Sequence, residues 1–221
     1  KKTLVKPFHI QEERLIRIVI YRTDSCKYLF ADLHHIVADG NSYDIFFADL
    51  NTAYKGMALQ SETYTGFDAA LDEEQEVENG RYKKAALYYD EIFAGIETES
   101  LPIADKREEV PVKGLASRTM KLSKEKIRKY CEKMQVTPNT LFTGLFGVVM
   151  GRYSNTEDAL FATIYNGRND SRLENTICML VKTLPVYCRF DGKMPVSVYL
   201  MAVQNQMLNS MANDIFPFYE I

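Results

Sequence analysis

The chain has 221 residues, of which 46% are hydrophobic and 26% are charged, and its formal net charge is −3. This length and composition suffice for a substantial apolar core in one domain or two small lobes. The acidic balance offers no basic field to a phosphate backbone, so nucleic acid is not an expected partner. No apolar run reaches the ~18 residues of a membrane span and no signal-peptide apolar region is visible, so we expect a cytoplasmic protein without membrane contact.

Four cysteines are spread along the chain, at Cys26, Cys131, Cys178 and Cys188. No two of them form a Cys-x-x-Cys pair, and they stand within apolar stretches. We therefore predict buried, reduced thiols rather than disulfides or a zinc cluster.

The first predicted elements form a β-hairpin. Residues 15–21 are rich in β-branched side chains, and residues 28–35 alternate with period two after a polar turn. Successive side chains of a strand point to opposite faces, so the pattern predicts that His34 and His35 point apart.

A turn, a helix and a linker are predicted to follow. Asp39 and the next two residues break the strand, and Ser42 is the predicted N-cap of a helix that ends at Gly56. Residues 57–80 are polar and acidic, which is typical of a solvated surface. Beyond a further helix, residues 96–115 carry two prolines and mixed charges without apolar periodicity, which indicates a linker.

The pattern of helices and strands restarts after the linker. One of these helices, opened by Thr137 and Pro138, is apolar on nearly every side and is predicted to be buried. The whole order is that of an α+β protein. The other predicted elements are a strand at 117–122, a helix capped by Ser123, strands at 159–165 and 183–190, and a helix capped by Ser197.

Two adjacent histidines at a strand-to-turn junction are the main candidates for a catalytic role. The ordinary imidazole pKa of ~6.5 lets a positioned histidine take up and release a proton near neutrality. Simple packing of both rings at a strand end is the alternative. Asp39, four residues after His35, is placed to fold back and fix the loop, while Gly40 permits a close backbone approach or a positive φ. A preorganised imidazole in a tight loop is a catalytic arrangement.

The segment from His34 to Gly40 resembles the His-His-x-x-x-Asp-Gly signature of the chloramphenicol-acetyltransferase-like superfamily. Weaker similarities in the same order along the chain resemble the condensation domains of non-ribosomal peptide synthetases. These are Pro7-Phe8, Tyr64 to Asp68, Tyr88-Tyr89, Asn166-Gly167-Arg168, Val181 to Pro185 and Pro217-Phe218. The resemblance implies a two-lobed α/β sandwich, incomplete at both ends, with residues 1–95 in the N-terminal lobe, 96–115 as the crossover linker and 116–221 in the C-terminal lobe.

Five positions depart from the family pattern. They leave acyl transfer as the expected reaction and bear on the subtype and on the wall of the substrate channel. The departures are Lys182 for the usual Asn, Cys178 for Gly, Leu180 for Phe, Asn213 for His and Tyr219 for Glu.

The resemblance implies an amide-forming reaction, in which an amine on one carrier protein attacks the thioester of a donor on another. His35 would contact the amine as a general base or as a positioning group, and His34 would orient the loop. Asp39 would hold the loop through an ion pair or backbone hydrogen bonds, and Gly40 would offer its N–H to the active-site end of the channel. Arg168 is one candidate partner for Asp39 and an arginine elsewhere is another, so Arg168 stays outside the predicted catalytic set.

The same resemblance implies the partners. Both substrates would travel on phosphopantetheine arms of donor and acceptor peptidyl carrier protein domains, alongside an adenylation domain of the same synthetase, and no cofactor would be bound by the domain itself. Because the family's active site lies in a channel between two lobes, the isolated fragment is expected to be inactive.

Other readings remain open at this point. A free-standing acyltransferase that uses a coenzyme A thioester, an epimerising relative and a non-catalytic carrier-docking module fit the same signature. A metal site is not expected, because His34 and His35 diverge and no His-Glu-x-x-His is present. A serine hydrolase and a nucleotide enzyme lack their Gly-x-Ser-x-Gly and phosphate-loop motifs.

Overall fold

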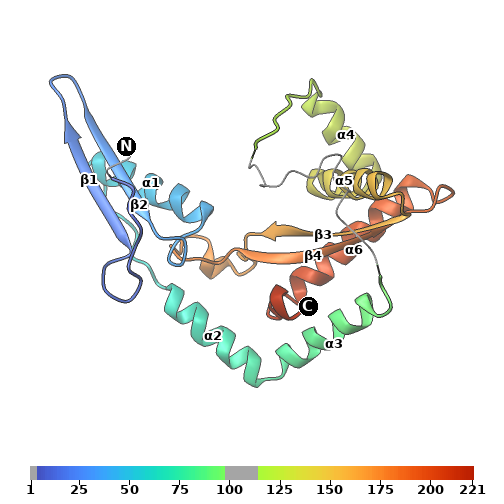
Figure 1. Ribbon diagram of the computed structural model, residues 1–221. Helices are drawn as coiled ribbons and strands as arrows, with labels where there is room; N and C mark the ends of the chain where they lie inside the picture. The colour runs from blue at the N-terminus through green and yellow to red at the C-terminus, as the bar shows by residue number, and fades with distance from the viewer. Residues whose placement is uncertain (1–3, 98–113) are drawn as a thin grey trace, which may run out of the picture. The chain divides into compact units, whose positions relative to one another are not determined.

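The computed structural model describes residues 4–97 and 114–221 and combines helices with short strands (Figure 1). Its residues divide into two compact units. The first unit is drawn from Lys1–Asn79 and Asn166–Lys182, and the second from Gly80–Tyr165 and Thr183–Ile221. The chain therefore returns to the first unit late, through one segment between two strands of the second.

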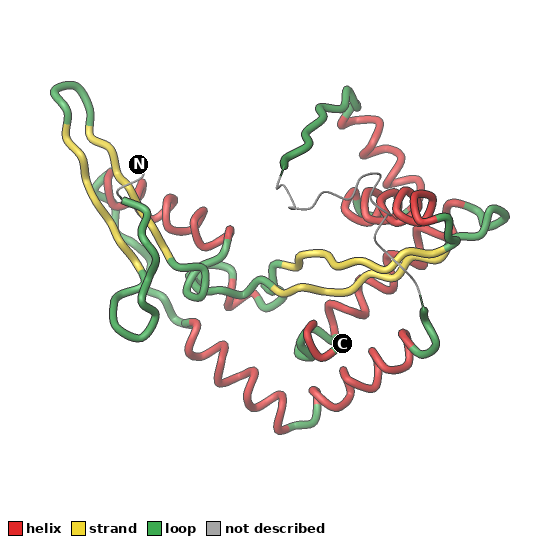
Figure 2. The backbone as a smooth tube through the Cα atoms, in the orientation of Figure 1, coloured by secondary structure: helices red, strands yellow, loops and turns green. Residues whose placement is uncertain are grey.

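The first unit begins with an antiparallel hairpin of β1 (Ile16–Arg22) and β2 (Lys27–Leu33) (Figure 2). The hairpin prediction is confirmed, but β2 ends at Leu33, so the prediction that His34 and His35 belong to the strand is wrong. Cys26 lies in the connecting turn and is exposed, contrary to the prediction of a buried thiol.

Two helices of the first unit begin with the same local motif. In a capping box, the N-cap side chain accepts a hydrogen bond from the N3 backbone while the N3 side chain accepts one from the N-cap backbone. Asp39 and Ser42 form such a box at the start of α1 (Gly40–Tyr54), and Thr65 and Asp68 form another at the start of α2 (Gly66–Glu78). The N-cap of α1 is therefore Asp39, and the prediction of Ser42 is wrong by three residues.

The segment of residues 166–182 packs within the first unit. It enters through Gly167, whose φ is +68° and whose added Cβ would lie 2.0 Å from the carbonyl oxygen of Leu180, so only glycine fits. The Thr176 hydroxyl donates to the Tyr64 carbonyl oxygen over 3.0 Å. Lys182, one of the departures from the family pattern, pairs with Glu73 at 2.8 Å.

The second unit holds the larger core. Its elements are α3 (Arg81–Phe93), α4 (Lys124–Met134), α5 (Pro138–Ser154), β3 (Asp158–Tyr165), β4 (Lys182–Arg189), α6 (Val196–Ala212) and a short 3₁₀ turn at Phe218–Glu220. Another 3₁₀ turn, Ser171–Leu173, lies in the returning segment of the first unit. The predicted strands at 159–165 and 183–190 are confirmed and pair with each other. The core residues include Cys131, Val136, Leu141, Val186, Cys188, Phe190, Tyr199, Leu200, Val203 and Met207.

Helix α5 packs through its small residues. Added Cβ atoms at Gly147 and Gly151 would lie 2.7 Å from Cys188 and 2.6 Å from Phe190, so these glycines let the helix approach β4 closely. The opposite face carries large apolar side chains that are 40 to 50% exposed, among them Phe142 and Val149. The prediction that α5 is a buried helix is therefore wrong for this face.

The remaining predictions have mixed outcomes. Ser123 and Thr137 cap their helices as predicted, but α6 has Pro195 rather than Ser197 at its N-cap. Residues 117–122 form neither helix nor strand, so the prediction of a strand there is wrong. Residues 98–113, most of the predicted linker, lie outside the described residues, and the division into lobes stays a prediction. Within the described ranges, no helix is both long and apolar enough to cross a bilayer.

Candidate functional site

The chain turns sharply after β2, and His34 holds the turn. Its backbone N–H donates to the Leu15 carbonyl oxygen over 2.9 Å, and its own carbonyl accepts from Val37 N–H over 3.0 Å. The Ile36 N–H donates to His34 Nδ1 over 3.1 Å. Since Nδ1 accepts this bond, the neutral ring carries its proton on Nε2. The half-buried imidazole thus serves the backbone of its own turn.

His35 has the opposite tautomer. Its Nδ1 lies 2.9 Å from the carbonyl oxygen of Ala38. A carbonyl oxygen only accepts hydrogen bonds, so Nδ1 carries the proton and Nε2 of the neutral ring keeps a free lone pair. His35 is exposed, whereas Ala38 is buried. The loop therefore anchors one ring nitrogen on a buried carbonyl and leaves the other nitrogen able to accept a proton.

Asp39 is buried, with only 3% of its surface exposed. Its Oδ1 accepts from Ser42 N–H at 2.9 Å and its Oδ2 from Leu180 N–H at 3.0 Å. Burial raises the pKa of the Asp39 carboxyl, but the hydrogen bonds from Leu180 and Ser42 and the charge of Arg168 outweigh burial and hold that pKa below its ordinary value. Asp39 is thus a charged, fully engaged carboxylate at the start of α1.

The partner of Asp39 is Arg168. Its Nη2 lies 3.2 Å from Asp39 Oδ1, and the two side chains are 6% and 4% exposed. Its Nη1 donates to the carbonyl oxygens of Leu173 and Thr176 over 2.6 and 2.8 Å. The Arg168 guanidinium therefore neutralises the buried Asp39 carboxylate and also stabilises the returning segment to which Arg168 belongs.

Gly40 is the first residue of α1 and is exposed. A Cβ added there would meet nothing within 4 Å, and its φ is not positive. Neither conformational reason for a glycine therefore applies within the described residues. Its N–H, like those of any first helical turn, has no acceptor inside the helix.

The residues of the sequence signature form one loop in the first unit, but their side chains have different roles. His34 and Asp39 hydrogen-bond to protein groups, whereas His35 projects a free nitrogen. Sequence reasoning missed Ser42 as a member of the cluster, and it left Arg168 as one candidate among others. The Gly167-Arg168 motif was the available signal for the arginine, while the contact of Ser42 with the Cys178 carbonyl has none in the sequence.

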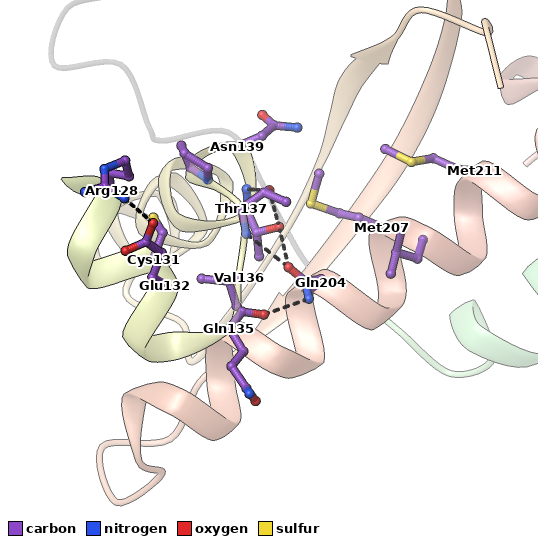
Figure 3. Close-up of a pocket in the computed structure, with 13 residues that line it drawn as sticks. Arg128, Cys131, Glu132, Gln135, Val136, Thr137, Asn139, Gln204, Met207 and Met211 are labelled. Carbon is purple, nitrogen blue, oxygen red and sulfur yellow. Dashed lines mark hydrogen bonds and ion pairs between the residues drawn. The ribbon is translucent and has the colours of Figure 1, made fainter. Parts of the chain in front are cut away.

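A pocket of about 820 Å³ lies elsewhere, in the second unit between α4, the start of α5 and α6 (Figure 3). Gln204 lines the pocket and hydrogen-bonds to two backbone groups. Its Oε1 accepts from Thr137 N–H at 3.1 Å, and its Nε2 donates to the Gln135 carbonyl at 3.2 Å. Met207 and Met211 supply apolar lining. None of the signature residues lines this pocket. Among the described residues, no cluster of three histidine, cysteine or acidic side chains is placed to hold a metal ion.

Comparison with known proteins points to one family. A family model described as "Condensation domain" matches residues 1–221. Bacitracin synthase 1 of Bacillus licheniformis is 28% identical over 225 residues, covering 100% of this chain and 4% of the relative. Gramicidin S synthase 2 of Brevibacillus brevis is 26% identical, covering 98% of this chain and 5% of the relative.

Solved structures show the same fold. The X-domain from teicoplanin biosynthesis matches with a TM-score of 0.78 and 20% identity, covering 98% of this chain and 52% of that one. The condensation domain from Monacolin K polyketide synthase MokA matches with a TM-score of 0.77 and 18% identity, covering 96% and 51%. The predicted α+β, chloramphenicol-acetyltransferase-like fold is confirmed. The chain spans about half of these structures and less than a tenth of the curated synthases.

Proposed function

Because this chain belongs to the condensation domain family, we propose that it provides the histidine loop of an acyltransferase that forms amide bonds in non-ribosomal peptide synthesis. The observation that carries the proposal is His35, whose Nδ1 is anchored to the Ala38 carbonyl while the ring is exposed. An anchored imidazole with an accessible lone pair can receive a proton or hold an amine in place.

The reaction would proceed without an acyl-enzyme. The amine lone pair attacks the thioester carbonyl carbon, the carbon–sulfur bond breaks, and the thiolate leaves and takes up a proton. His35 Nε2 accepts a hydrogen bond from the attacking amine and either aligns it or removes its proton as the new bond forms. General-base help is typically worth about 10²- to 10⁴-fold in rate, so His35 accounts for a large but incomplete share of the acceleration.

The other signature residues would act through the loop. His34 fixes the turn, since its Nδ1 accepts from Ile36 N–H. Asp39 and Arg168 neutralise each other while holding α1 against the returning segment. Gly40 N–H, which has no intrahelical acceptor, is available to a substrate oxygen. Of the signature residues, we therefore propose that His35 and Gly40 touch substrate.

The proposed partners follow from the family and from the relatives' names, which are those of peptide antibiotic synthases. Donor and acceptor acyl groups would arrive as thioesters on the phosphopantetheine arms of carrier protein domains, with an adenylation domain in the same synthetase. We also propose that residues 1–221 alone turn over little substrate.

The test uses the intact synthetase that contains this chain, with both carrier domains preloaded. His35→Ala should lower amide formation by about 10²- to 10⁴-fold while carrier loading stays normal. His9→Ala is the matched control, because His9 is the third histidine, is exposed and lies outside the signature. Product formation by His35→Ala at the unmodified rate would contradict the proposal and favour a non-catalytic docking module.

The same assay separates the remaining enzyme alternatives. An epimerising relative would exchange the α-hydrogen of a carrier-bound aminoacyl group with solvent deuterium and form no amide. A free-standing acyltransferase would accept a coenzyme A thioester without carrier proteins. Either result would contradict carrier-dependent condensation.

A further inference from the structure

We infer that Ser42 is a positioning residue for His35, and that it acts through the peptide group between Ala38 and Asp39. The inference deepens the proposed function and rests on it for its catalytic meaning. Ser42 does not contact the His35 ring in the structure; its hydroxyl sets the orientation of the group to which that ring is anchored.

One planar peptide group links the His35 ring to the Ser42 hydroxyl. The peptide bond keeps the carbonyl of Ala38 and the N–H of Asp39 in one plane and on opposite sides. The carbonyl oxygen accepts from His35 Nδ1 at 2.9 Å, and the N–H donates to Ser42 Oγ at 3.2 Å. Rotation of this plane would move both groups together. By holding the Asp39 N–H, the Ser42 hydroxyl therefore fixes the orientation of the Ala38 carbonyl. That carbonyl selects the His35 tautomer and leaves Nε2 directed outward.

Burial makes the hydroxyl difficult to replace. Ser42 has 0% of its surface exposed, Asp39 3% and Ala38 2%, so a water molecule has no ready path to the Asp39 N–H. The hydroxyl also has one proton to donate, with Asp39 Oδ1 at 2.8 Å and the Cys178 carbonyl at 2.9 Å as acceptors. Arg168 Nη2 approaches it at 3.5 Å. Ser42 thus joins the histidine loop to the returning segment at one buried point.

Helix capping alone does not account for this arrangement. Thr65 and Asp68 complete the same capping box at α2, yet their hydrogen bonds stay within that box. At α1, the N-cap N–H that enters the box belongs to the peptide whose other end holds a histidine. Loss of either cap is expected to weaken its helix. Loss of the Ser42 hydroxyl is also expected to free the peptide whose carbonyl anchors the His35 ring.

The first experiment reads the His35 ring directly and does not depend on activity. In the unmodified chain, ¹⁵N-detected imidazole NMR should show His35 as a single Nδ1–H tautomer, and the Asp39 amide should exchange slowly with solvent. Ser42→Ala should yield a mixture of both neutral tautomers and faster exchange at Asp39. Ser42→Cys, which keeps a side chain but is a weaker acceptor, should shift the ring in the same direction. Thr65→Ala should leave His35 unchanged.

The second experiment measures the consequence in the intact synthetase. Ser42→Ala should lower kcat for amide formation by about 10- to 100-fold, as expected for a misplaced catalytic group, with KM for the acceptor carrier changed by less than about twofold because Ser42 is buried away from any partner. Thr65→Ala should change neither.

The outcomes separate this inference from the proposed function. An unchanged His35 tautomer in a folded Ser42→Ala chain would overturn the inference and leave the proposed function standing. Full activity of His35→Ala would overturn the function, while the NMR result would still decide whether Ser42 orients the ring. If both Ser42 variants fail to fold, the unmodified chain decides, because a mixed His35 tautomer or a rapidly exchanging Asp39 amide contradicts the inference.

Discussion

Helices α1 and α2 begin with the same two functional groups, a carboxylate and a hydroxyl, in reversed order. At α1 the carboxylate is the N-cap and the hydroxyl follows at N3, whereas at α2 the hydroxyl of Thr65 is the N-cap and the carboxylate of Asp68 follows. Both boxes satisfy otherwise unpaired N–H groups of a first helical turn. They differ in burial, since Asp39 and Ser42 are buried while Asp68 is exposed.

The difference shows how a local motif becomes a tertiary one. A carboxylate has more acceptor capacity than one cap uses. At α2 the remaining acceptor capacity of the exposed Asp68 carboxylate faces solvent. At α1 the remainder goes to Leu180 N–H and to Arg168, both from the returning segment. The α1 box therefore fixes a loop, a helix and a distant segment together, and it lies beside the histidine that we propose to be catalytic.

The largest expected difference in stability between the two capping boxes comes from substitution of their carboxylates. Asp39→Asn should destabilise the fold by about 3 to 5 kcal/mol, because it leaves the buried Arg168 charge without its partner. Asp68→Asn removes an exposed carboxylate that hydrogen-bonds to Thr65, so its effect should be small. Urea unfolding of the two variants measures the difference, and equal losses would show that burial does not distinguish the boxes.

A similar contrast holds for two glycines with positive φ. Gly167→Ala should cost more than about 2 kcal/mol, because the strained backbone is combined with a Cβ placed 2.0 Å from the Leu180 carbonyl oxygen. Gly56→Ala meets no atom within 4 Å and should cost only the backbone strain of about 1 kcal/mol. Thermal unfolding at matched protein concentration compares the two, and a milder effect at Gly167 would argue against the close approach of Leu180.

The pH dependence of stability should also reflect the buried Asp39 carboxylate. The pKa of Asp39 in the folded chain lies below its ordinary value of 3.8, so the unfolded chain binds more protons at low pH. The stabilisation by Asp39 is present above that ordinary value and is lost as the pH falls through the lowered pKa. Unfolding titrations at decreasing pH should show a larger loss below about pH 4 in the unmodified chain than in Asp39→Asn, which keeps the lowered pKa values of other carboxyls such as Asp68. A parallel loss in that variant would assign the effect to other carboxylates.

The smallest effect should come from the α2 cap itself. Thr65→Ala should cost about 1 kcal/mol, the usual contribution of an N-cap hydroxyl. Circular dichroism during urea unfolding would measure it. A cost as large as that of Asp39→Asn would mean that the α2 box has tertiary contacts beyond those in the structure.

Much of the fold could be predicted from sequence because its signals are local. Period-two alternation predicted the hairpin, and Ser123 and Thr137-Pro138 marked helix starts through capping chemistry. The strands at 159–165 and 183–190 were also predicted, but not their pairing with each other. One error arose where two local signals competed. Asp39 and Ser42 are both good caps, and only their box geometry shows that the helix starts at the first of them.

The candidate site was predictable in its residue types and less so in its contacts. The spacing of His35 and Asp39 indicated a compact loop. The positions of Arg168, Cys178 and Leu180, more than 120 residues away, depend on a segment that returns to the first unit. Such long-range hydrogen bonds leave no periodic trace in a sequence, so the contacts of Ser42 could not be predicted from it.

The protonation of the two adjacent rings tests the account most directly. At a pH well above the ordinary imidazole value of ~6.5, ¹⁵N imidazole NMR of the unmodified chain should show opposite tautomers, with the proton on Nδ1 of His35 and on Nε2 of His34. A His35 ring protonated on Nε2 would have no lone pair facing outward, and that result would contradict the proposed role of His35 in receiving the amine.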